Sequence, residues 1–103
     1  MKKLIFKLNY AGKILAGEKV TTIRLSANVR KGDVVEVYVG HARIGKAVIT
    51  RVTKKKLSSI SDKEARMDGF RNKEELVKAL MKIYGKKRVD EDPEVYIIEF
   101  KLL

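Results

Sequence analysis

The alternation of hydrophobic and polar residues along the chain predicts five β-strands. The segments with this two-residue period cover residues 2–8, 20–25, 34–39, 42–53 and 94–102. The last segment is the clearest, because Tyr96, Ile98 and Phe100 fall on one face. Gly45 interrupts the fourth segment, and its missing side chain permits a bulge or a sharp bend. We therefore expect the fourth strand to be long and bent.

Helical periodicity and capping residues predict three helices between these strands. They cover residues 10–16, 61–67 and 72–84. Ser61 and Glu64 fit a capping box, in which each side chain accepts a hydrogen bond from a free amide at the helix start. Asn72 can cap the longest helix, and Gly85 can end it. An apolar stripe along that helix should pack on the sheet.

The order of these elements indicates the fold class. A strand and a short helix are followed by three strands, two helices and a final strand. Mostly consecutive strands with glycine bends are typical of small barrels. The sequence therefore predicts an α+β fold, a small β-barrel of about five to six mostly antiparallel strands with two or three flanking helices. At 103 residues, a single domain over residues 1–103 is expected.

The net charge points to a class of partner. The chain has 24 Lys and Arg against 13 Asp and Glu, a formal net charge of +11. Such a protein attracts polyanions, because its cationic side chains release the counterions condensed on phosphates. RNA or a nucleotide is therefore the expected partner, and the sequence does not identify a protein partner. The alternative is a lysine-rich surface that is solvated and has no polyanionic partner.

Several residue types that carry chemistry are missing. The chain has no cysteine, which excludes disulfides and thiolate metal sites, and His41 is its only histidine. No metal or other cofactor is expected, since no clustered carboxylates replace these ligands. No segment reaches the length of a membrane span or of a signal-peptide core, so a cytoplasmic location without membrane contact is expected. Abundant Lys and Glu without Cys or Gln is similar to hyperthermophile composition.

Five segments of the chain, taken in order, resemble the successive motifs of the ASCH family. They cover residues 15–24, 31–33, 45–49, 68–70 and 95–100. The first contains a Gly-x-Lys-x-x-Thr-x-Arg pattern, formed by Gly17, Lys19, Thr22 and Arg24. The resemblance implies a PUA-like β-barrel with a cleft beside this pattern, which is proposed in the family to bind RNA. It suggests a small, free-standing prokaryotic member, and the composition suggests an archaeal one.

Strand pleating places Thr22 and Arg24 on the same face, where a hydroxyl and an arginine fork would meet a phosphate or a base edge together. Lys19, just before the strand, could add a point charge. The alternative is structural, with Thr22 as a simple strand former and Arg24 paired with Glu36 or Glu99. The family resemblance favours the binding site.

The resemblance also raises a catalytic alternative. Some small bacterial members are amidohydrolases that remove the acetyl group from acetylcytidine with a Lys, a Thr and a Glu. The Lys and Thr correspond to Lys19 and Thr22, whereas the Glu falls on the shorter Asp68. As a base, Lys19 would need its pKa lowered by roughly three units. Asp68 beside it would oppose this, because a carboxylate favours the ammonium.

Further residues could extend the binding surface. Asp68 belongs to the same expected cleft, and Tyr38 and Phe70 are candidates for stacking on a base, although either ring could instead lie in the core. Two basic clusters could continue a phosphate-binding track or lie in solvated loops. They are residues 86–88 after the long helix, and Lys54, Lys55 and Lys56 after the long strand.

Overall fold

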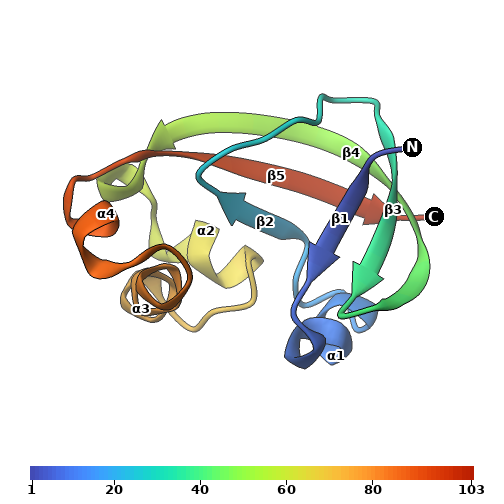
Figure 1. The fold of residues 1–103 in the computed structure, drawn as a ribbon, viewed down its shortest axis with the longest axis horizontal. Helices are drawn as coiled ribbons and strands as arrows, with labels where there is room; N and C mark the ends of the chain where they lie inside the picture. The colour runs from blue at the N-terminus through green and yellow to red at the C-terminus, as the bar shows by residue number, and fades with distance from the viewer.

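Five strands form one mixed sheet that curls into a half-barrel in the computed structural model, which describes residues 1–103 (Figure 1). The strands are β1 (Lys3–Phe6), β2 (Thr21–Arg24), β3 (Val34–Val39), β4 (Ala42–Lys56) and β5 (Glu94–Leu102). Their order in the sheet is β1-β3-β4-β5-β2, so β1 and β2 are the edge strands. β1 runs parallel to β3, and all other pairs are antiparallel. The predicted α+β fold is confirmed, and the predicted small barrel of mostly antiparallel strands takes the form of a five-stranded half-barrel.

The long strand β4 bends at two irregular positions. Its pairing with β3 shifts between Val37 and Tyr38, opposite the segment that contains Gly45, so the predicted bend there is confirmed. A second shift, between Ile49 and Arg51, occurs in the pairing with β5. Because bulges increase strand bending, β4 can pair with both neighbours while the sheet curls around the core.

Two strand boundaries differ from the prediction. β4 continues to Lys56, so the lysines at its end belong to the strand and do not follow it. β1 ends at Phe6, whereas the prediction continued to Leu8 on the same buried face. Leu8 instead begins a 3-10 turn and is 71% exposed. Alternation alone could not place that end, since an exposed leucine keeps the apolar pattern going.

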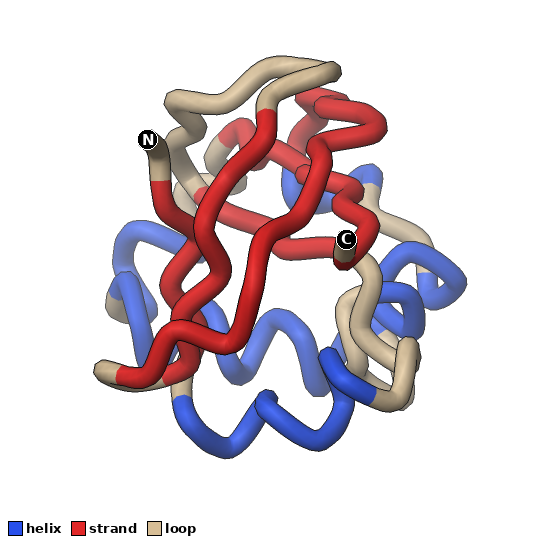
Figure 2. The backbone as a smooth tube through the Cα atoms, turned by 90° about the vertical axis from the view of Figure 1, so that its right-hand side faces the viewer, coloured by secondary structure: helices blue, strands red, loops and turns tan.

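Most of the helices lie on one side of the curled strands (Figure 2). The helices are η1 (Leu8–Tyr10), α1 (Ala11–Leu15), η2 (Leu57–Ser59), α2 (Asp62–Met67), α3 (Lys73–Tyr84) and α4 (Lys86–Asp90). The predicted capping box of Ser61 and Glu64 is present, and the Asn72 side chain accepts a hydrogen bond from the Glu75 amide. α4 was not predicted, because Gly85 ends α3 and the basic residues after it resembled a loop.

The structure has two hydrophobic cores, and β5 contributes buried residues to both. The first lies inside the sheet and includes Phe6, Ile14 and Val37. The second lies between the helices and the sheet and includes Ile23 and Leu76. No helix in the structure is long and apolar enough to cross a membrane.

We expect residues on the buried face of α3 to contribute more to the stability of the protein than residues on its exposed face. Leu76 is 1% exposed in the second core, so Leu76→Ala should lower the free energy of unfolding by about 2–5 kcal/mol. Ile83 lies on the same helix but is 49% exposed, so Ile83→Ala should change it by less than about 0.5 kcal/mol. Urea denaturation of both variants measures the difference. Equal losses would show that α3 does not pack as described.

Candidate functional site

A cavity of about 250 Å³ lies between β1, β2 and α3, where the two cores meet. Most of its lining is hydrophobic, and four of its side chains are aromatic: Phe6, Tyr10, Phe70 and Tyr84. The polar side chains are Lys7, Lys19, Thr22, Arg24 and Asp68. An apolar hollow with a few convergent polar groups is the usual form of a small-molecule site.

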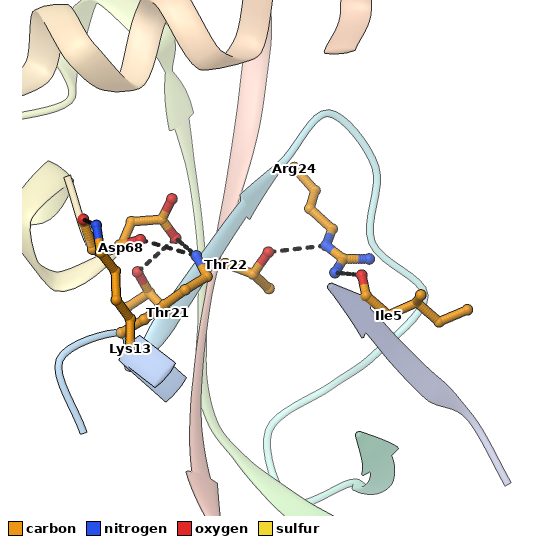
Figure 3. A network of polar contacts seen from close by, with 8 residues as sticks. Ile5, Lys13, Thr21, Thr22, Arg24 and Asp68 are labelled. Carbon is orange, nitrogen blue, oxygen red and sulfur yellow. Dashed lines mark hydrogen bonds and ion pairs between the residues drawn. The ribbon is translucent and has the colours of Figure 1, made fainter. Parts of the chain in front are cut away.

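The cavity floor holds a buried ion pair. The Lys19 ammonium donates hydrogen bonds to Oδ1 of Asp68, at 2.9 Å, and to the Asp68 backbone carbonyl, at 3.0 Å. The Thr21 hydroxyl donates to the same Oδ1 at 3.1 Å (Figure 3). Lys19 is only 3% exposed and Asp68 only 4%. Removing either partner would leave an uncompensated buried charge, so the two residues depend on each other.

Burial shifts the pKa values of both partners. It raises the pKa of the Asp68 carboxyl to about 6, although the Lys19 ammonium and the Thr21 hydroxyl act in the opposite direction. Burial likewise lowers the pKa of Lys19, and the Asp68 carboxylate counteracts this shift. Desolvation is thus the larger effect for each group.

The loop between α2 and α3 carries Asp68 into the site. Gly69 has φ +93°, a conformation that residues with a side chain rarely adopt. A Cβ at Gly69 would lie 3.4 Å from side-chain atoms of both Lys13 and Lys19. The Lys13 ammonium also donates to the Gly69 carbonyl at 2.6 Å, and the Val20 amide donates to the Met67 carbonyl. The loop is therefore held closely between α1 and the start of β2.

Arg24 lies between the two edge strands. Its Nε donates to the Thr22 hydroxyl at 3.0 Å, and its Nη2 donates to the Ile5 carbonyl at 2.9 Å (Figure 3). The guanidinium carbon is 5.4 Å from the ring centroid of Phe6. The alternative ion pairs considered for Arg24 are not formed. Glu36 is instead 4.0 Å from Arg43, and Glu99 is 3.8 Å from Arg51.

Two aromatic rings stand beside the ion pair. Tyr10 and Phe70 meet edge to face, with ring centroids 6.3 Å apart. The Lys19 ammonium is 5.0 Å from the Tyr10 centroid, close enough for a cation–π interaction. Burial raises the pKa of the Tyr10 hydroxyl, and the Asp68 carboxylate adds to that shift. The rings give the cavity flat apolar surfaces next to charged groups.

Five of the predicted site residues line this one cavity: Lys19, Thr22, Arg24, Asp68 and Phe70. Tyr38 does not. Its hydroxyl donates to Glu36 at 3.1 Å, and the Lys3 ammonium lies 4.9 Å from its ring centroid. Tyr38 follows the buried Val37 in β3 and so lies on the opposite face of the strand, which means that any stacking by Tyr38 would occur outside this cavity.

The three lysines at the end of β4 also lie outside the cavity lining. Lys54 is 3.7 Å from Glu94, and Lys55 is 2.9 Å from Glu64, whereas Lys56 forms no ion pair. Two of the three positive charges are therefore partly neutralised by carboxylates. This arrangement weakens the expectation that they continue a phosphate track from the cleft.

The sequence did not indicate several residues of the site. Tyr10 falls within the predicted helix over residues 10–16, and Ile83 and Tyr84 fall within the predicted helix over residues 72–84. Apolar spacing on a helix is the same for a core and for a cavity wall, so no sequence signal separates them. Thr21 was not predicted either, because strand pleating places it on the face of β2 opposite Thr22. Its hydroxyl nevertheless donates a hydrogen bond to Asp68.

A second hollow, of about 400 Å³, lies on the face of β2 that carries Thr21. It is larger than the first but has mostly polar lining, and of the predicted residues it includes only Lys55. It has no aromatic wall. No group of three or more His, Asp or Glu side chains in the structure is placed to hold a metal ion. The smaller cavity is therefore the better candidate site.

The fold is similar to that of solved structures. An ASCH domain from Lactobacillus crispatus JV V101 matches with a TM-score of 0.76 and 20% identity, over 89% of this chain and 69% of that one. Protein EF3133 from Enterococcus faecalis V583, a DUF984 protein, has a TM-score of 0.75 and 12% identity, over 100% and 81% of the two chains. The hypothetical protein PH0355 has a TM-score of 0.68 and 23% identity over all of both chains.

No family model matches the sequence, and neither does any curated protein. At these identities the similar structures establish the fold alone. The chain therefore has an ASCH-like fold, as its sequence motifs suggested.

The raised pKa of Asp68 should make stability depend on pH. The ordinary value is 3.8 and the value in the folded protein is about 6, so between them the folded state keeps a proton that the unfolded chain has lost. The free energy of unfolding should therefore fall as the pH rises from about 4 to 6, by an amount on the order of 2–3 kcal/mol.

Urea denaturation of the wild type and of Asp68→Asn across this range isolates the effect. The variant also loses the ion pair with Lys19, which gives a loss that does not change with pH while Lys19 stays charged. Only the pH-dependent part of the difference reports on Asp68. A difference between the two proteins that is constant from pH 4 to 7 would contradict a raised pKa.

Proposed function

We propose that the protein binds RNA or a nucleotide by taking one unstacked base into the cavity between β1, β2 and α3. The observation that supports this most directly is the composition of the cavity. Aromatic rings, Tyr10 and Phe70 among them, stand next to Thr22, Lys19 and Asp68 at the floor. A base needs both features, since its faces stack on aromatic rings and its edge forms hydrogen bonds.

The size of the cavity limits the ligand. Pockets for drug-sized molecules range from roughly 300 to 1,000 Å³, and this one is about 250 Å³. It can therefore hold a single base but not a stretch of nucleic acid. In an RNA, that base would come from a single-stranded segment or a loop, where bases can turn out of the stack.

The charge of the protein supports an anionic ligand. Only nine basic residues form an ion pair with a carboxylate, out of 24 Lys and Arg. Lys7 is one of the unpaired residues, and it lies exposed in the cavity lining. The ASCH-like fold also supports the proposal, because the family resemblance implies an RNA-binding cleft at this position.

Stacking gives the first test. Phe70→Leu removes an aromatic face from the cavity and should weaken binding by about 5- to 150-fold, which corresponds to about 1–3 kcal/mol. Fluorescence anisotropy with a labelled single-stranded RNA of mixed sequence measures the affinity. If about five phosphates are neutralised, the log–log salt slope should be about −3.5.

Tyr38→Leu is the matched control, because it removes an exposed-face tyrosine of β3 outside the cavity lining. It should leave the affinity unchanged. Equal losses in the two variants would move the interface away from the cavity. An affinity that does not respond to salt, or no binding of RNA and of free nucleotides alike, would rule out the proposed function.

A second candidate is the removal of the acetyl group from acetylcytidine. It is favoured by the placement of Lys19, Thr22 and Asp68 around one cavity and by the burial that lowers the Lys19 pKa. The hydrogen bonds favour it less. Lys19 donates to Asp68, whereas Thr22 accepts from Arg24, so Lys19 is not arranged to take a proton from the Thr22 hydroxyl.

Purified protein incubated with acetylcytidine tests this second candidate. Catalysis predicts release of cytidine that is lost in both Lys19→Ala and Thr22→Val, as followed by chromatography. Thr22→Val is needed because Lys19→Ala leaves Asp68 unpaired in the interior and can unfold the protein. Cytidine release no faster than in these variants would exclude the hydrolase.

A further inference from the structure

The half-barrel has a gap between its two edge strands. β1 pairs only with β3, and β2 pairs only with β5, so no backbone ladder joins β1 to β2. The cavity lies at this gap, with Ile5 and Phe6 on one side and Thr22 and Ile23 on the other. The distance between the edge strands therefore determines the width of the cavity.

The Arg24 side chain connects the two edges. Its Nη2 donates to the carbonyl of Ile5 in β1, while its Nε donates to Thr22 in its own strand β2. Its guanidinium also lies over the ring of Phe6, 5.4 Å from the centroid. Figure 3 shows the side chain extended from β2 toward the end of β1. Three contacts thus hold one guanidinium between two strands that are otherwise not paired.

These contacts use the side edge of the Arg24 guanidinium, one of the edges through which an arginine binds phosphate. Side-on recognition of a phosphate needs the Nε proton together with a proton of a neighbouring amino group. In the structure the Nε proton is donated to Thr22, and Nη2 already donates to Ile5. A phosphate could replace these acceptors only if the link between the strands were broken.

Lys7 is in the opposite situation. It follows β1 directly, lines the same cavity, is exposed, and forms no hydrogen bond or ion pair through its side chain. A free ammonium at the edge of a cavity can meet a phosphate without losing any existing contact.

We propose that Arg24 is a positioning residue, which joins β1 to β2 and sets the width of the cavity, and that Lys7 provides the contact to the ligand phosphate. The proposal rests on the proposed function, and it refines the sequence-based expectation that Arg24 itself binds the ligand. Loss of the Arg24 link would let the edges separate. The cavity would then bind every base less tightly and distinguish less well between a large and a small base.

Nucleosides separate the two roles because they carry no phosphate. The probes are adenosine, uridine and their 5′-monophosphates, titrated by calorimetry into the wild type, Arg24→Met, Arg24→Lys, Lys7→Met and Lys3→Met. Lys3 is the control, since it lies on β1 outside the cavity lining. Arg24→Lys keeps the charge but cannot donate along two directions from a rigid plane.

We expect the wild type to bind the monophosphates about threefold more tightly than the nucleosides. This phosphate preference is typical of one exposed charge contact. Lys7→Met should abolish this phosphate preference, and Lys3→Met should keep it. Arg24→Met should keep the phosphate preference but weaken the binding of both nucleosides by about tenfold, or ~1.4 kcal/mol. The ratio of adenosine to uridine affinity should also change. Arg24→Lys should behave like Arg24→Met.

Several outcomes would overturn the proposal. Arg24 would be a phosphate ligand if Arg24→Met lost the phosphate preference with unchanged nucleoside affinity and Arg24→Lys retained that preference. An unchanged ratio of adenosine to uridine affinity in Arg24→Met would show that Arg24 does not set the width. A phosphate preference that persists in Lys7→Met would show that Lys7 does not contact the phosphate.

Hydrogen exchange of the free proteins tests the link without any ligand. The Glu36 amide in β3 donates to the carbonyl of Lys2, just before β1, and the Gly40 amide after β3 donates to the carbonyl of Phe6, at the end of β1. They should exchange faster in Arg24→Met than in Lys3→Met if Arg24 holds β1 in place. If the wild type bound neither RNA nor any nucleoside or nucleotide, the proposed function would fail, while unchanged exchange would separately refute the link.

Discussion

The buried ion pair of Lys19 and Asp68 is the constraint on which the site depends. The two residues are 49 positions apart in the chain, and their contact joins the start of β2 to the loop between α2 and α3. Removing two charges from water costs several kcal/mol per ion, so such a pair persists only with good geometry and further hydrogen bonds. Here the Asp68 backbone carbonyl and the Thr21 hydroxyl provide them. Phe70, two residues after Asp68 in the same loop, meets the ring of Tyr10 at one wall of the cavity.

The ion pair also bears on whether Lys19 could act as a base. A lysine that acts as a base must be neutral, and a carboxylate 2.9 Å away favours its protonated form. Burial acts in the opposite direction on both residues, because it lowers the pKa of Lys19 and raises that of Asp68. The hydrogen bonds of Lys19 hold the loop that carries Asp68 in place. The polar groups at the cavity floor therefore have fixed positions, which suits ligand recognition. This arrangement favours recognition over bond cleavage.

Local signals predicted most of the elements, and long-range contacts explain what they missed. β5, α2 and α3 each carry their own period or capping residues within a few positions, and they were predicted with nearly correct bounds. α4 has no such pattern, and its stability depends on Val89 packing into the second core. The site residues came from the family motifs and not from periodicity. Lys54 shows the limit, because its carboxylate partner lies 40 positions away at Glu94.

The position of the cavity follows from the way the sheet ends. Both edge strands have only four residues, which limits the unpaired backbone that could recruit another chain. The two edge strands do not pair with each other, so the gap between them is filled by side chains, among them Arg24 and Phe6. A gap filled by side chains can admit a ligand, whereas a continuous backbone ladder cannot. The incomplete closure of the sheet and the candidate site are therefore two aspects of one structural feature.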